Sequence, residues 1–318
     1  MRRRPTVPPQ PPKTVGGGRY ELKNLLGTGG MASVYQVRDH WFNQDLALKL
    51  LLPHNSRSDK TRTRFLNEAR TMSQLDHPNI IRVHDIGDED DHFFFVMELA
   101  TTSLSTHVRR HGRMAPEVGI RYMFQALRGL EYAHTAGVVH RDIKPHNMLL
   151  GIDGADRAPD DGPGEVKLTD FGIARVLAMS TDARVTGTGD TLGTLAYMSP
   201  EQRVDPRRAG PPADVYGIGA TLYILVTGRR PFDLAMSAID PTVMERLPVP
   251  LRPIVRRSTA HRPDDRYQTA KSMAVALLEA HRELMPDAPP LATDMSEFGQ
   301  AADADTIVQV TTDKPSKG

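Results

Sequence analysis

The chain has 318 residues, enough for about two domains at roughly 150 residues each. Its 40 basic and 39 acidic residues leave a net charge of +1, so no overall charge draws it to nucleic acid or to a membrane surface. It has no cysteine, which excludes disulfides, cysteine-ligated metal centres and thiol nucleophiles. No apolar run reaches the ~20 residues that a membrane helix needs, and Arg2–Arg4 precedes prolines rather than an apolar segment. We therefore expect a cytoplasmic protein with no membrane span and no nucleic-acid partner.

The two ends of the sequence have the composition of tails. Residues 1–18 are rich in proline, arginine and glycine, which disfavours packed structure, and we expect them to be disordered. Residues 285–318 lose hydrophobic periodicity, and we expect a second flexible tail there. The folded part should then lie between them, over residues 19–284.

The first part of this region is rich in predicted strands. Short strands separated by turn residues are predicted over 20–26, 33–38, 46–52, 80–86 and 92–98. A helix is predicted over 62–75, where apolar residues recur every three or four positions. The acidic run Asp88–Asp91 is interpreted as a solvated turn. Residues 19–99 should therefore form a small, strand-rich lobe.

The second part is mainly helical. Ile120, Met123, Leu127 and Leu130 mark one face of a long helix, and further helices are predicted over 214–227 and 269–284. Short strands are predicted over 148–150 and 166–169. The acidic, glycine-rich stretch 151–165 between them could suggest a calcium loop, but its spacing does not match the EF-hand, and a long hairpin turn is favoured. The expected fold is α+β, with a helical lobe over residues 100–284.

Three features of the small lobe are weak signals of a phosphate site. Glycines between the first two strands, in Leu26-Gly27-Thr28-Gly29-Gly30, allow the backbone to approach a phosphate chain. A dinucleotide-binding fold is disfavoured because a strand, not a helix, follows them. Lys49 on the third strand could neutralise phosphate charge, and Glu68 on the helix could pair with it. Each feature alone is more typical of a tight turn or a solvated side chain.

Two motifs in the large lobe are more informative. His140-Arg141-Asp142-Ile143-Lys144-Pro145-His146-Asn147 combines an aspartate, a lysine and an asparagine in one loop broken by proline. Aspartate can accept a hydroxyl proton, lysine can balance phosphate charge, and asparagine offers an oxygen to a hard metal ion. Thr169-Asp170-Phe171-Gly172 follows the next predicted strand. Asn147 and Asp170 together suit Mg²⁺ bound to a nucleotide phosphate.

Because these motifs occur in the family's order, the chain resembles the protein kinase family. The residues within the motifs are most similar to those of bacterial eukaryotic-like Ser/Thr kinases. The resemblance covers about residues 20–284 and implies the bilobal protein kinase fold. Ser199-Pro200-Glu201 stands in the APE position, and Asp214 matches the aspartate that begins the family's central buried helix. Arg266 matches the late arginine that pairs with the glutamate at position 201. The third glycine of the phosphate loop is replaced by Ala32.

The resemblance implies ATP and Mg²⁺ as cofactors, with Mn²⁺ as a substitute, and Ser/Thr-containing proteins as substrates. Lys49, held by Glu68, would contact the phosphates. Asn147 and Asp170 would hold the metal ion. Asp142 would act on the substrate hydroxyl, and Lys144 would act on the γ-phosphoryl group. Thr194 would belong to the substrate loop. The nucleotide would be lined by Leu26, Gly27, Thr28, Gly29, Gly30, Val34, Ala47, Lys49, Met97, Glu98, Leu99 and Leu149.

The resemblance also suggests regulation. Arg141, which precedes Asp142, would respond to phosphate on the activation segment, where the candidates are Thr186, Thr188 and Thr191. Autophosphorylation would need a transient homodimer. The alternative is that these threonines only belong to a flexible loop.

Two rival functions remain. A pseudokinase scaffold is disfavoured because Lys49, Asp142, Asn147 and Asp170 are all present. A small-molecule phosphotransferase is disfavoured by the segment from Gly193 to Glu201, on which a protein kinase places its peptide.

Overall fold

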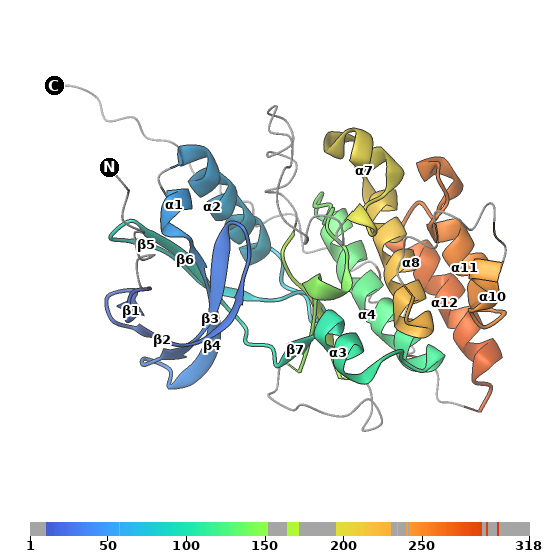
Figure 1. Ribbon diagram of the computed structural model, residues 1–318, viewed down its shortest axis with the longest axis horizontal. Coiled ribbons are helices and arrows are strands. Elements are labelled where there is room, and N and C mark those ends of the chain that lie inside the picture. Colours follow the sequence, from blue (N-terminus) through green and yellow to red (C-terminus); the bar gives the residue numbers. More distant parts are fainter. Residues whose placement is uncertain are drawn as a thin grey trace, which may run out of the picture.

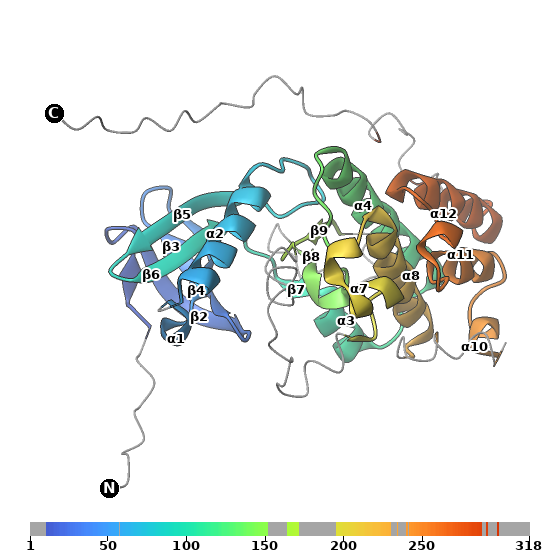
Figure 2. The same cartoon turned by 90° about the horizontal axis from the view of Figure 1, so that it is seen from above.

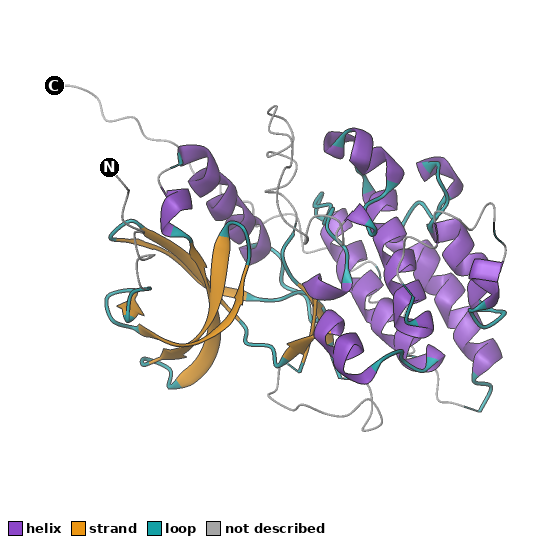
Figure 3. Ribbon diagram, viewed as in Figure 1, coloured by secondary structure: helices purple, strands orange, loops and turns teal. Residues whose placement is uncertain are grey.

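The protein forms two lobes, shown in a computed structural model (Figure 1). One lobe is an antiparallel sheet with two helices, and the other is mainly helical (Figure 3), which confirms the predicted α+β architecture. The structure describes residues 11–56, 58–151, 164–171, 195–229, 234, 240, 242–287, 291 and 298.

The sheet of the first lobe has six antiparallel strands in the order β1-β2-β3-β4-β6-β5. The strands are β1 (Thr14–Val15), β2 (Tyr20–Thr28), β3 (Ala32–Asp39), β4 (Gln44–Leu51), β5 (Val83–Glu89) and β6 (His92–Met97). Helix α1 (Pro53–Ser56) leads into α2 (Asp59–Ser73), which packs Phe65 against Phe95 of the sheet at a ring distance of 5.2 Å. Helix α2 begins three residues before the predicted start because the Ser58 side chain accepts a hydrogen bond from the Thr61 N–H.

The first strand corrects the prediction of a disordered tail over residues 1–18. Thr14 and Val15 pair with β2, and Val15 is buried under the sheet. Gly16–Gly18 all have positive φ, which glycine adopts without strain, so they turn the chain from β1 into β2. The Gly17 N–H donates to the Glu89 carboxylate at 3.1 Å. The glycines that suggested disorder therefore make a tight turn.

The fourth predicted strand begins later than expected. The sequence predicts a strand from residue 80, but β5 begins at Val83. The buried residues Ile80 and Ile81 instead join the other lobe, where the Ile81 N–H donates to the Leu168 carbonyl at 2.9 Å and Ile80 forms a parallel bridge. An apolar run predicts burial, but it does not say which lobe buries it.

The helical lobe is built around three helices that lie side by side (Figure 2). They are α4 (Pro116–Thr135), α8 (Pro211–Thr227) and α12 (Ala270–Leu284). Around them lie α3 (Leu104–His111), α7 (Pro200–Val204), α10 (Thr242–Glu245) and α11 (Leu251–Ser258). A small sheet, β7 (Thr102–Ser103), β8 (Met148–Leu150) and β9 (Val166–Leu168), faces the first lobe. Strands β8 and β9 pair antiparallel as the predicted hairpin requires, but residues 152–163 of its turn lie outside the described residues.

Helix α8 carries the loop that leads to β8. A Cβ atom at Gly217 would lie 2.6 Å from the Cβ of Ile143, so only glycine lets this loop lie directly on the helix. Although α8 is almost wholly buried, no helix among the described residues is long and apolar enough to cross a membrane.

The C-terminal tail prediction also needs correction. Leu291 and Phe298 are buried in the main hydrophobic core. The ring of Phe298 meets Phe124 of α4 edge to face at 5.6 Å, and its carbonyl accepts a hydrogen bond from Lys271 Nζ at 3.2 Å. Isolated apolar residues without periodicity gave no signal of this contact in the sequence.

We expect Phe298→Ala to lower the free energy of unfolding by about 2–4 kcal/mol, because it removes a buried aromatic side chain. Val249→Ala, at an exposed position, should change it by less than about 0.5 kcal/mol. Urea denaturation of both variants measures the difference. Equal stability of the two would contradict the packing of Phe298 on α4.

Candidate active site

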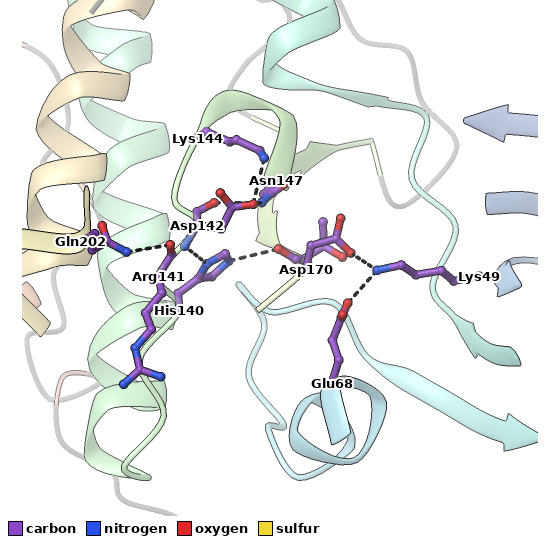
Figure 4. A network of polar contacts seen from close by, with 10 residues as sticks. Lys49, Glu68, His140, Arg141, Asp142, Lys144, Asn147, Asp170 and Gln202 are labelled. Atoms are coloured by element: carbon purple, nitrogen blue, oxygen red, sulfur yellow. Dashed lines mark hydrogen bonds and ion pairs between the residues drawn. The ribbon is translucent and has the colours of Figure 1, made fainter. Parts of the chain in front are cut away.

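The site lies where the two lobes face each other, and an ion cluster joins them (Figure 4). Alternation along β4 places Ala47, Lys49 and Leu51 on the face toward α2. Lys49 Nζ lies 2.6 Å from Glu68 Oε1 on α2, the pair that the sequence predicts. The same nitrogen lies 2.8 Å from Asp170 Oδ1, which follows β9 in the other lobe. One ammonium group thus links strand, helix and the opposite lobe.

The three charges of this cluster shift one another's pKa. Burial lowers the pKa of Lys49, but the charges of Asp170 and Glu68 outweigh burial, so the pKa is raised. Burial and the negative charge of Asp170 raise the pKa of Glu68, although Lys49 lowers it. Burial raises the pKa of Asp170, but the charge and hydrogen bond of Lys49, together with the charge of Lys144, outweigh burial, and the pKa is lowered. Lys49 and Asp170 therefore remain ionised together.

The loop before β8 gathers the predicted Asp142, Lys144 and Asn147. Lys144 Nζ lies 2.8 Å from Asp142 Oδ2. Asn147 Nδ2 donates to the same oxygen at 3.0 Å and to the Asp142 carbonyl at 2.8 Å. The Asp142 carboxylate is therefore held by Lys144 and by Asn147, which the short 3-10 helix Pro145–Asn147 brings back toward it.

A buried histidine connects this loop to the residues after β9. His140 Nδ1 accepts the Asp142 N–H at 3.2 Å, so its Nε2 carries the proton that is donated to the Thr169 carbonyl at 3.0 Å. Its ring also stacks on Phe171 at 4.4 Å. Burial lowers the pKa of His140, which agrees with a neutral imidazole.

Asp214 at the start of α8 fixes the backbone of the same loop. Its carboxylate accepts the N–H groups of His140 at 2.8 Å and Arg141 at 2.6 Å, as well as His134 Nε2 at 2.8 Å. Burial alone would raise the pKa of Asp214, but the hydrogen bond from His134 and its charge lower it. Arg141 has a φ of 63°, a strained value for a residue with a side chain, and these bonds hold it there. The contact of His134 with Asp214 was not predicted from the sequence.

Helix α7 contacts the loop from another direction. Gln202 Nε2 donates to the Arg141 carbonyl at 2.9 Å, a contact that the sequence did not predict, although Gln202 directly follows the Ser199-Pro200-Glu201 motif. The next contact was predicted: both terminal nitrogens of the buried Arg266 lie 2.7 Å from the Glu201 carboxylate.

The guanidinium of Arg141 bonds through Nε to the Ala209 carbonyl at 3.1 Å. Its predicted phosphate partners, Thr186, Thr188 and Thr191, lie outside the described residues, as does Thr194.

Beside the ion cluster lies the predicted adenine wall. Ala47 and Met97 are buried in the core, and Val34, Leu99 and Leu149 pack partly buried against it. The Glu98 N–H already donates to the Arg82 carbonyl. Of the two backbone groups of Glu98, the carbonyl is therefore the one left to bond to an adenine base. The Glu98 side chain is held by Lys167 Nζ at 2.9 Å, a pair that the sequence did not indicate.

The glycine-rich turn leaves room for a ligand. A Cβ atom at Gly27 or Gly30 would meet nothing within 4 Å, and at Gly29 only a backbone oxygen at 3.6 Å. None of the three has a positive φ, so neither packing nor backbone conformation requires glycine here. Their missing side chains instead leave the space that a phosphate chain needs. Leu26 and Thr28, in the same turn, are exposed.

The residues predicted to hold a metal ion have suitable oxygen atoms. Asn147 uses its amide nitrogen for both bonds to Asp142, which leaves its Oδ1 outside them. Asp170 uses Oδ1 toward Lys49, which leaves its second carboxylate oxygen outside that pair. Among the described residues no cluster of three or more acidic, histidine or cysteine ligands occurs. Two oxygen ligands suit Mg²⁺, which keeps water and phosphate oxygens as its other ligands.

We expect stability to fall as the pH is lowered from about 7 to about 5, because two histidines must stay neutral. His77 Nδ1 accepts the Asn79 N–H, as His140 Nδ1 accepts that of Asp142, and burial lowers the pKa of His77 to about 4. Both histidines have a lower pKa in the folded protein than in the unfolded chain. Their contribution to stability is therefore fully present above the unfolded pKa and is lost as the pH falls below that value. The loss is at most about 1.4 kcal/mol per pH unit for each histidine.

Urea denaturation across this pH range measures the slope. His77→Asn, whose Oδ1 can accept the same N–H without titrating, should make the slope shallower. An unchanged slope would contradict the role of His77.

Comparison with known proteins agrees with this geometry. Residues 20–287 match the family described as protein kinase domain. The serine/threonine-protein kinase PrkC of Bacillus subtilis is 35% identical over 269 residues, which cover 80% of this chain and 39% of that protein. PknB of Mycobacterium leprae, also a serine/threonine-protein kinase, is 35% identical over 297 residues, covering 87% of this chain and 45% of that protein. The chain therefore spans less than half the length of these relatives.

A solved structure shows the same fold. The PknI kinase domain of Mycobacterium tuberculosis superposes with a TM-score of 0.61 at 26% identity and covers 85% of this chain and 99% of that domain. The family match includes every described residue of the ion cluster and of the Asp142 loop. This chain therefore belongs to the protein kinase family.

Proposed function

We propose that this chain transfers the γ-phosphoryl group of ATP to serine or threonine hydroxyls of proteins. The observation that supports this best is the Asp142 carboxylate, held by Lys144 at 2.8 Å and Asn147 at 3.0 Å, in the lobe that faces Lys49. A fixed carboxylate can orient a hydroxyl and accept its proton, while the cation beside it balances the negative charge of the transferred phosphoryl group.

The other residues divide the remaining work. Lys49, positioned by Glu68, binds the α- and β-phosphates under the glycine-rich turn. Val34, Ala47 and Leu149 enclose the adenine, with Met97 beside it. Lys144 stabilises the transferred phosphoryl group while Asp142 holds the acceptor. Most of the rate enhancement then comes from positioning and fixed charge.

The divalent ion of this family is proposed to be Mg²⁺, which Mn²⁺ could replace. Asn147 and Asp170 would hold it through the oxygens that the protein leaves unused. When bound, the ion neutralises phosphate charge. Lys49 keeps Asp170 ionised and therefore able to bind it.

Regulation, location and domain boundaries are proposed from the same resemblance. Phosphate on Thr186, Thr188 or Thr191 would attract Arg141, whose terminal guanidinium nitrogens are not used by its bond to Ala209. A transient homodimer would allow one copy to modify another. The kinase domain, expected over residues 19–284, is proposed to include β1 as well, with Leu291 and Phe298 packed on it, in a cytoplasmic protein.

We expect Asp142→Asn to lower phosphoryl transfer at least about 100-fold, because the amide cannot accept the hydroxyl proton. Binding of Mg·ATP should change by less than about threefold, since Lys49 and the glycine-rich turn are untouched. Labelled ATP, a generic basic protein and peptide mapping of the label measure both the transfer and the acceptor residue.

Asp264→Asn makes the same chemical change at an exposed site and should leave transfer unchanged. Transfer that persists in the Asp142 variant would contradict its role. Mg·ATP binding without transfer by the native chain, even after incubation with an active Ser/Thr kinase, would favour a nucleotide-binding scaffold.

A further inference from the structure

Gln202 contacts the loop of residues 140–147 that carries Asp142, here called the catalytic loop, but it has no part in the chemistry proposed above. It lies on α7, three residues beyond Ser199, where the activation segment ends, and it is 4% exposed. Figure 4 shows its side chain reaching from α7 to the backbone of Arg141. The bond joins Gln202 Nε2 to the Arg141 carbonyl at 2.9 Å.

That carbonyl belongs to the peptide unit that carries Asp142. The N–H of the same unit, on Asp142, donates to His140 Nδ1 at 3.2 Å. The peptide unit is therefore fixed at its oxygen by Gln202 and at its nitrogen by His140. A rotation of this unit would swing the Asp142 side chain away from Lys144 and Asn147.

The other end of the Gln202 side chain holds α7 itself. Gln202 Oε1 accepts the Ser199 N–H at 3.2 Å and the Ser199 hydroxyl at 3.0 Å. The first of these bonds, together with the Gln202 N–H donating to the Ser199 side chain, forms a capping box. Glutamate serves as well as glutamine in a capping box, because only an acceptor is needed there. The bond to Arg141, by contrast, needs a donor, which an ionised glutamate lacks. Helix capping alone therefore does not account for glutamine at this position.

We propose that Gln202 is a positioning residue for Asp142, and that it ties the end of the activation segment to the catalytic loop. The kinetic part of this inference rests on the proposed kinase function, whereas the structural link does not. Burial of both Gln202 and Ser199 keeps water from replacing these bonds. Displacement of α7 would then be passed directly to the peptide unit of Asp142.

Gln202→Glu separates the two roles, because it keeps the cap acceptor and removes the donor. We expect kcat to fall about 10- to 100-fold, with KM for ATP within about twofold, since misplacement affects transfer rather than nucleotide contacts. Amide exchange of residues 140–142 should become about tenfold faster. Exchange is measured by mass spectrometry and does not depend on activity.

The pH profile gives a sharper readout. The carboxyl group that Gln202→Glu introduces could again donate to the Arg141 carbonyl once it is protonated, so the ratio of variant to native kcat should rise from about pH 8 to about pH 6. The titrating groups around it, His140, Asp142, Glu201 and Asp214, are present in both proteins and largely cancel in the ratio. Gln202→Met cannot donate at any pH, so its ratio should stay flat.

Gln125→Glu is the matched control. Gln125 Oε1 on α4 accepts the Val166 N–H at 2.7 Å, so this variant makes the same change away from Asp142. It should keep kcat within about twofold of native. Native kcat and native exchange in Gln202→Glu would overturn the proposal, as would a pH-independent ratio equal to that of Gln202→Met. If the native chain transfers no phosphoryl group, the kinase proposal fails. The amide exchange rates of residues 140–142 then test by themselves whether Gln202 fixes the peptide unit of Asp142.

Discussion

A buried carboxylate at the start of α8 fixes the loop on which the site depends. Asp214 has lost its hydration, so its charge must be satisfied by the hydrogen bonds that it accepts from His134, His140 and Arg141. Two of these come from consecutive backbone N–H groups, which hold Arg141 at a φ that it would otherwise avoid. The same backbone places Asp142 beside Lys144. One charge therefore determines the conformation of the catalytic loop.

The opposite lobe meets this loop through a second cluster of charges. Lys49 bonds to Glu68 in its own lobe and to Asp170 in the other, so its position depends on how the lobes approach each other. His140 completes the connection, because it contacts Asp142, Thr169 and Phe171. The proposed phosphate-binding and proton-accepting groups are therefore held in one continuous network (Figure 4).

Periodicity and ordered motifs predicted the lobes, most helices and strands, and the contacts of Lys49 with Glu68 and of Glu201 with Arg266. These depend on local pattern and on residue types that a shared chemistry requires. Contacts between distant segments with no such pattern were missed. The contact of Gln202 with the Arg141 backbone could not be predicted, because no residue type in the sequence indicates it. Ile81 bonds across to the other lobe, Gly16–Gly18 make a turn rather than a tail, and Phe298 packs on α4 without any periodic neighbour.

The most direct test of the role of Asp214 is single-turnover phosphoryl transfer by Asp214→Asn, measured with its Mg·ATP affinity. Asparagine offers one acceptor oxygen in place of two, so it cannot hold both N–H groups of the loop as the carboxylate does. We expect transfer to fall about 100-fold while Mg·ATP affinity changes by less than about threefold, because the nucleotide groups lie mainly in the other lobe. Native transfer by a folded Asp214→Asn protein would contradict the control of the catalytic loop by this carboxylate.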